Sequence, residues 1–204
     1  MASDPSIGSS RTFPMSADLQ SRLTELAAGA DRAEIMEFYD SLAAVQIEQM
    51  IGSWRGAGLP TGHVFDGLLE QFGWHGKRFD SPEDAHPLVF RGETGRLFSI
   101  DPSRIPMSLL MDHIDLARSS FGAGFFRLSS RMFATDKPKA RLRMTQYRGV
   151  VSATMIYDAL PINDVFRAVG PDTLVGAMDM RGVDQPFMFL LQRERPSCGA
   201  SPAP

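Results

Sequence analysis

Cysteine is almost absent from this sequence, and its scarcity limits the chemistry of the chain. The single cysteine, Cys198, excludes an internal disulfide and lies in a segment rich in Ser and Pro. No His–x3–His or Cys–x2–Cys spacing occurs, so we expect no zinc or other metal site. The glycine patterns of phosphate loops and of dinucleotide-binding folds are also missing, and we expect no cofactor.

Excess charge and long apolar runs are lacking too. The formal net charge is only -3 and no basic cluster occurs, so we expect no nucleic acid as partner. The longest apolar runs fall far short of the roughly 20 residues of a membrane helix, which argues against membrane insertion. The first 16 residues lack the apolar core of a signal peptide, and we therefore expect a cytoplasmic protein.

Phenylalanine and methionine are the residues present in excess. The chain has 14 Phe and 12 Met, against 3 Tyr and 2 Trp. Both are large and apolar, and Met is adaptable in shape, so they pack a core or line a cavity for an apolar guest. Composition leaves both interpretations open.

Two helices are predicted before any strand. Leu19, Leu23 and Leu26 share one face of a helix over 16–28, and Asp31 with Glu34 forms a capping box that starts a second helix. We assign 16–44 as a helical prefix, with disordered tails at 1–15 and 195–204.

From residue 51 the pattern changes to short segments separated by Gly and Pro. The predicted strands are 52–57, 74–79, 86–91, 95–100, 140–148, 150–158, 173–181 and 186–194. Arg148-Gly149 is a tight hairpin turn, and short helices are predicted at 65–72, 107–116 and 163–169. This pattern predicts a mainly β fold: one antiparallel barrel over 45–194, with N-terminal helices and short helical inserts.

Residues Gly52-Ser53-Trp54-Arg55-Gly56 form a GxWxG motif. It resembles the first strand of the calycin barrels, which include lipocalins, fatty-acid-binding proteins and nitrobindins. The resemblance implies that an arginine of the last strand, Arg193 or Arg195, covers Trp54. About fifty residues precede the motif here, a departure from lipocalins, where it lies near the start.

A longer match extends over both halves of the barrel. The segments that carry it include Pro60-Thr61-Gly62-His63, Gly76-Lys77-Arg78-Phe79, Tyr147-Arg148-Gly149, Met155-Ile156-Tyr157-Asp158 and Gly176-Ala177-Met178-Asp179. They are similar to the GXWXG domain of bacterial proteins (45–100 here) and to the domain of unknown function that usually follows it (139–194). The resemblance implies a calycin-like barrel. It also suggests kinship with cofactor-free α-pinene oxide lyases, which open a terpene epoxide to an unsaturated aldehyde.

Opening an epoxide requires an acid, and four residues are candidate catalytic groups. His63 follows a Pro-Thr-Gly turn, and Asp66 lies three residues further on, where its carboxylate either orients the imidazole or caps the following helix. Tyr157 and Asp158 end a predicted strand, and only one of them can face inward.

Other polar residues are assigned structural roles. Asp158, Asp164 and Arg167 are interpreted as a salt-bridge cluster, or else as holding a buried acid, and Lys77-Arg78 as the solvated side of a strand. The expected lining of the ligand cavity is large and apolar: Trp54, Trp74, Phe79, Met144, Met155, Phe187 and Phe189.

Three functions are compatible with the sequence. The leading hypothesis is a cofactor-independent lyase or isomerase acting on a small apolar terpenoid, and the runner-up is a carrier of a fatty acid or similar ligand. Haem binding, as in nitrobindins, is disfavoured because the last histidine, His113, precedes the final four strands. The sequence does not decide between a monomer and a homodimer.

Overall fold

The computed structural model describes residues 16–92, 94–105, 113–119, 122, 124, 126 and 129–195. The tail predicted at 1–15, residues 196–204 of the other tail, and residues 107–112 of a predicted helix lie outside this part of the chain. Residues 113–118 of that region include a short helix, α6 (Ile114–Arg118).

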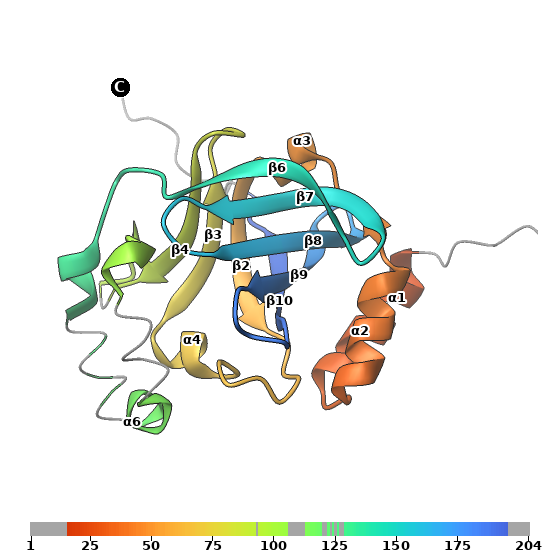
Figure 1. The fold of residues 1–204 in the computed structure, drawn as a ribbon, viewed down its shortest axis with the longest axis horizontal. Helices are drawn as coiled ribbons and strands as arrows, with labels where there is room; N and C mark the ends of the chain where they lie inside the picture. Colours follow the sequence, from red (N-terminus) through yellow and green to blue (C-terminus); the bar gives the residue numbers. More distant parts are fainter. Residues whose placement is uncertain are drawn as a thin grey trace, which may run out of the picture.

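Within the described residues, eight antiparallel strands close into a barrel (Figure 1). They are β2 (Gly52–Gly58), β3 (Trp74–Phe79), β4 (Ala85–Arg91), β6 (Ala140–Tyr147), β7 (Val150–Tyr157), β8 (Ile162–Gly170), β9 (Thr173–Met180) and β10 (Phe187–Arg193). The order around the barrel is β8-β7-β6-β4-β3-β2-β10-β9, and the pairing of β8 with β9 closes it. The predicted antiparallel barrel is confirmed.

Two short strands extend the sheet outside the ring. β1 (Ala43–Ala44) pairs with β8, and β5 (Leu97–Ser99) pairs with β4. In the described part of the chain β4 and β6 meet at one residue pair, Ala85 with Ala140. After β5, Ile100 forms an isolated antiparallel bridge with Ala134. Two 3-10 turns lie next to these residues in the sequence, Pro102–Arg104 and Ser130–Phe133.

The predicted helix at 163–169 is wrong, because these residues form the centre of β8. The spacing of Asp164 and Arg167 imitates a helical pair, but in the strand the two side chains lie on opposite faces. Val165 and Phe166 are both buried because β8 is covered on both sides, and such strands lose the alternation of a half-exposed strand.

The covering layer on the outside of β8 consists of α1 (Ser16–Ala27) and α2 (Arg32–Ser41) (Figure 1). The predicted capping box of α2 is present: the Glu34 amide donates to Asp31 Oδ1 at 2.9 Å, and the Asp31 amide donates to Glu34 Oε2 at 3.3 Å. Leucines of α1 and aromatic residues of α2 pack on outward-facing residues of the sheet in a second core: Leu23, Leu26, Ile35, Phe38, Val169, Val175 and Met188.

Alternation along β10 separates the two cores. Phe187, Phe189 and Leu191 point into the barrel, whereas Met188 belongs to the core under the helices. Two short helices complete the rim, α3 (Ile47–Met50) before β2 and α4 (Leu68–Gln71) before β3.

Candidate functional site

One end of the barrel is closed by Trp54. Its side chain is completely buried, and its indole N–H donates to the Met50 carbonyl at 2.7 Å. The Arg193 guanidinium lies 4.2 Å from the centre of the Trp54 ring and donates to the Ile51 carbonyl at 2.8 Å. The expected arginine cover is therefore confirmed, and Trp54 acts as a plug.

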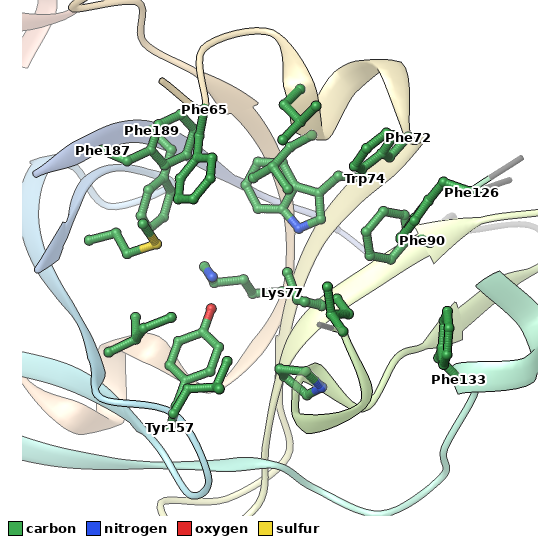
Figure 2. A pocket seen from close by; sticks show the side chains of 18 of the residues that line it. Phe65, Phe72, Trp74, Lys77, Phe90, Phe126, Phe133, Tyr157, Phe187 and Phe189 are labelled. Carbon is green, nitrogen blue, oxygen red and sulfur yellow. The ribbon is translucent and has the colours of Figure 1, made fainter. Parts of the chain in front are cut away.

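The other half of the barrel is hollow. It holds a cavity of about 340 Å³, at the lower end of the usual range for small-molecule sites, about 300–1,000 Å³. Aromatic rings form much of its wall (Figure 2): Phe65, Phe72, Trp74, Phe90, Phe126, Phe133, Phe187 and Phe189.

Three of the expected lining residues, Trp74, Phe187 and Phe189, do line this cavity. The other four do not line it, which corrects the prediction for them. Trp54, Phe79 and Met155 are buried in the core of the barrel, and Met144 is partly buried against that core. Their part of the barrel is filled by contacts such as the edge-to-face pair of Phe79 and Phe166, with ring centres 5.9 Å apart.

Two glycines give the cavity its shape. A Cβ atom on Gly56, the last residue of the GxWxG motif, would lie 2.2 Å from Cη2 of Trp74. A Cβ on Gly176 would lie 2.2 Å from Cζ of Phe189. The absent side chains therefore let these two rings lie flat against the neighbouring strands.

A polar cluster interrupts the apolar wall. Lys77 Nζ lies 2.7 Å from Asp164 Oδ2 and donates to the Pro87 carbonyl at 3.1 Å. The Tyr157 hydroxyl donates to the same Asp164 oxygen at 3.4 Å. All three side chains line the cavity, and Figure 2 shows the Lys77 ammonium and the Tyr157 hydroxyl close together there.

This cluster keeps hydrogen-bonding capacity for a ligand. An ammonium group has three N–H donors, and Asp164 and Pro87 engage two of them. Asp164 Oδ1 is buried without a hydrogen-bond partner among the described residues. Burial, and then the Asp164 charge, raise the pKa of Tyr157 well above its usual value, so its hydroxyl stays protonated at neutral pH.

Burial also raises the pKa of Asp164, against the opposing effect of Lys77. The adjacent ammonium is the compensation that a buried carboxylate requires. The lysine also faces the Phe189 ring, 4.9 Å from its centre, as a cation–π contact.

The sequence-based interpretation of Lys77 as a solvated residue is wrong, since the residue is only 4% exposed. Lys77 pairs with Trp54 of β2 and lies two residues from Phe79, so it shares their inward-facing side of the sheet. β3 is irregular before this point, and its register against β4 shifts on both sides of Gly76. The extra residue of a bulge breaks the alternation of the strand, so Trp74 and Lys77 face the same cavity. Gly76 within a strand is the signal that marks such a bulge.

His63 lies behind the cavity wall instead of in it. Its ring packs on Phe65 and Phe187, at 5.2 and 5.6 Å between centres, and Nδ1 accepts the Phe65 amide at 3.1 Å. Burial lowers its pKa. Asp66 accepts the backbone amides of Thr61 and His63, both at 2.9 Å, so it holds the turn and does not orient the imidazole.

Asp158 and Arg167 are also separate from the cavity. Tyr157 is the inward member of its pair, and Asp158 is exposed at the end of β7. Asp164 pairs with Lys77 and not with Arg167, which lies on the outer face of β8 with its guanidinium 5.2 Å from the Tyr39 ring centre. The expected Asp158–Asp164–Arg167 cluster does not form.

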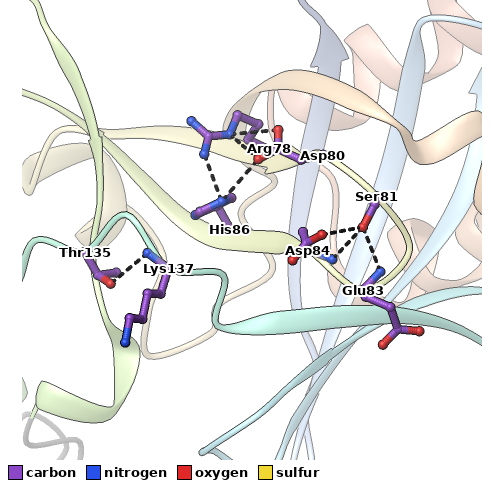
Figure 3. A network of polar contacts seen from close by, with 8 residues as sticks. All are labelled: Arg78, Asp80, Ser81, Glu83, Asp84, His86, Thr135 and Lys137. Carbon is purple, nitrogen blue, oxygen red and sulfur yellow. Dashed lines mark hydrogen bonds and ion pairs between the residues drawn. The ribbon is translucent and has the colours of Figure 1, made fainter.

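His86 belongs to a polar network at the turn between β3 and β4 (Figure 3). Its Nε2 accepts Arg78 Nη2 at 2.8 Å, while Arg78 Nε donates to Asp80 at 3.1 Å. Burial and the Arg78 charge lower the pKa of His86, which keeps the imidazole neutral. Ser81 and Asp84 continue the network along the turn.

Among the residues that the structure describes, no group of three or more His, Cys, Asp or Glu side chains is placed to hold a metal ion. No helix in that part of the chain is long and apolar enough to cross a membrane.

Two parts of the chain match known protein families, and a solved structure has a similar fold. Residues 37–95 match the family described as GXWXG protein, and residues 138–193 match the domain of unknown function DUF4334. A crystal structure of a protein from Thermomonospora curvata is similar, with a TM-score of 0.64 and 34% sequence identity over 87% of this chain and 99% of that one. No curated protein matches the sequence. The chain therefore belongs to the family of proteins that join a GXWXG domain to a DUF4334 domain.

Proposed function

We propose that the protein is a cofactor-independent lyase or isomerase that binds a small, uncharged terpenoid in the barrel cavity and opens its epoxide with acid assistance. The observation that carries the proposal is the buried Lys77–Asp164–Tyr157 cluster in an otherwise largely apolar cavity. The resemblance to α-pinene oxide lyases suggests the substrate class.

The cluster supplies both halves of an acid–base reaction. A hydrogen bond or proton from Lys77 or Tyr157 to the epoxide oxygen weakens the C–O bond, and its cleavage leaves a positive charge on carbon. Asp164, with one oxygen unpaired, stabilises this charge and accepts a proton from carbon. The reaction is an isomerisation: one proton is given and one is taken, and no electrons are exchanged.

The wall of the cavity protects this intermediate. Phenylalanine rings exclude water, which would otherwise trap the cation as a diol. The same apolar wall suits a terpene skeleton.

Charge balance argues against a fatty acid as the ligand. Carriers of acids use an inward cation for the carboxylate, but the Lys77 charge is already compensated by Asp164 at 2.7 Å. A bound carboxylate would meet the unpaired oxygen of Asp164 in a low-dielectric cavity. An uncharged molecule meets no such repulsion.

Gas chromatography of reactions with α-pinene oxide tests the proposal. We expect the wild type to form an isomer of unchanged mass, Lys77→Met to lower turnover by at least about 10²-fold, and Tyr157→Phe to lower it by a smaller factor. His63→Gln, which changes a residue behind the wall, should stay close to wild type. If no epoxide reacts and solvent extraction of the protein releases a bound fatty acid, the carrier hypothesis replaces this one.

A further inference from the structure

Trp74, which lines the cavity, holds an unused hydrogen-bond donor. Its side chain is only 7% exposed, yet Nε1 has no hydrogen-bond partner among the described residues. A buried indole N–H normally has a partner, as Trp54 shows with its bond to the Met50 carbonyl. The two tryptophans of the chain therefore differ in this respect.

The donor faces the same space as the polar cluster. Figure 2 shows the nitrogen edge of Trp74 directed into the region that Lys77 and Tyr157 also face, and Lys77 Nζ is 5.6 Å from the Trp74 ring centre. The bulge at Gly76 brings both donors of β3 to one side, and Gly56 permits the indole to lie flat on β2.

We propose that Trp74 donates to the oxygen of the ligand together with Lys77, and that this pair selects uncharged molecules with an acceptor oxygen over hydrocarbons of the same shape. A neutral ether, epoxide or carbonyl oxygen has two lone pairs and can accept both donors. The inference rests on the proposed function in one respect, that the cavity holds a small apolar molecule.

A hydrocarbon of equal shape leaves both donors without a partner. Displacing solvent from a buried donor without replacing its hydrogen bond is costly, so the oxygen contributes to selectivity as well as to orientation. Trp74 is on this account a specificity-determining residue, whatever reaction follows.

Camphor and bornane are suitable probes, because they share one bicyclic skeleton and only camphor carries a carbonyl oxygen. In wild-type protein with ¹⁵N-labelled tryptophan, two indole N–H signals are expected from the two tryptophans. Camphor should move the Trp74 signal downfield, whereas bornane should not. The Trp54 signal, bonded to Met50 in either case, is the internal reference.

The variant Trp74→Phe tests the same point by affinity. Headspace gas chromatography of the volatile probes should show camphor binding weakened by about fivefold to tenfold, the value of one hydrogen bond. Bornane binding should change far less. Phe90→Leu, which alters an apolar part of the wall, should affect both probes alike.

Two results would overturn the inference, and they are distinguishable. If wild type binds camphor and bornane equally and the Trp74 signal responds equally to both, Trp74 is not a donor to the ligand, although the cavity still binds apolar molecules. If neither probe binds, the proposed function fails along with the inference. The wild-type spectra decide between these outcomes even where Trp74→Phe does not fold.

Discussion

Single glycine residues determine where the aromatic rings of the cavity lie. Gly56 belongs to the GxWxG motif, and the Trp74 ring occupies the space that a side chain at this position would fill. The motif therefore serves both parts of the barrel: Trp54 plugs the closed end, and Gly56 seats the indole that lines the hollow half.

Gly56→Ala should be destabilising and should also weaken ligand binding. The added Cβ would overlap the Trp74 ring at 2.2 Å and push it toward the cavity, and overpacking of this kind costs about 1–3 kcal/mol. Urea unfolding and camphor binding measure the two effects. Gly124→Ala is the control, since a Cβ there meets nothing within 4 Å. An unfolding midpoint equal to wild type would show that the ring moves without strain.

Buried histidines make stability depend on pH. Burial lowers the pKa of His63 in the folded protein, whereas the unfolded chain titrates near its ordinary value of about 6.5. Between these two values the unfolded state binds more protons, so stability is full above pH about 6.5 and falls as the pH decreases. His86 acts in the same direction.

His63→Gln should therefore lose less stability than wild type between pH 7.5 and 5.5. Urea unfolding at both pH values measures the difference. His113→Gln, at an exposed position, should retain the wild-type dependence. If His63→Gln retains it as well, His63 does not contribute to the pH effect.

At the scale of elements, the strands show what the sequence reveals and what it hides. Strands with a regular alternation or a clear turn were predictable, and the hairpin at Arg148-Gly149 is present with both residues in the left-handed region (φ 47° and 80°). β8 was not predictable, because its outer face is covered by helices that are distant in sequence. The residue pattern of one strand does not reveal that helices from another part of the chain cover its outer face.

The candidate site was predictable only in part, for a similar reason. Tyr157 and three of the aromatic lining residues follow from strand alternation and from apolar composition. Lys77 does not, because a charged side chain favours the solvated face of a strand, and its partner Asp164 comes from the strand mistaken for a helix. The pairing of β3 and β8 residues across the barrel interior is a property of the closed fold.

The closed end can be tested as an element of its own. Trp54→Ala should cost about 3–5 kcal/mol in the free energy of unfolding, because it leaves a void under Arg193. Arg193→Lys should cost less, since it keeps a cation but loses the fork that reaches the Gln49 and Ile51 carbonyls. Urea unfolding compares the two. A Trp54→Ala variant that unfolds at the wild-type urea concentration would show that Trp54 is no plug.

At the scale of the whole molecule, the packed cores that stabilise the fold and the cavity proposed to bind the ligand lie in different parts. The core beneath the helical layer and the Trp54 end are filled by buried apolar side chains, whereas residues of α4 and α6 help to line the cavity. A rigid closed sheet joins the two parts and holds Lys77, Tyr157 and Asp164 from three different strands in fixed positions.

A crystal structure with 1,8-cineole, an unreactive terpene ether, tests the central claim most directly. We predict that the ether lies in the barrel cavity with its oxygen within hydrogen-bond distance of Lys77 Nζ, and with its carbon skeleton against the phenylalanine rings. Cineole bound elsewhere, or bound in the cavity with its oxygen turned away from Lys77, Tyr157 and Trp74, would contradict the account.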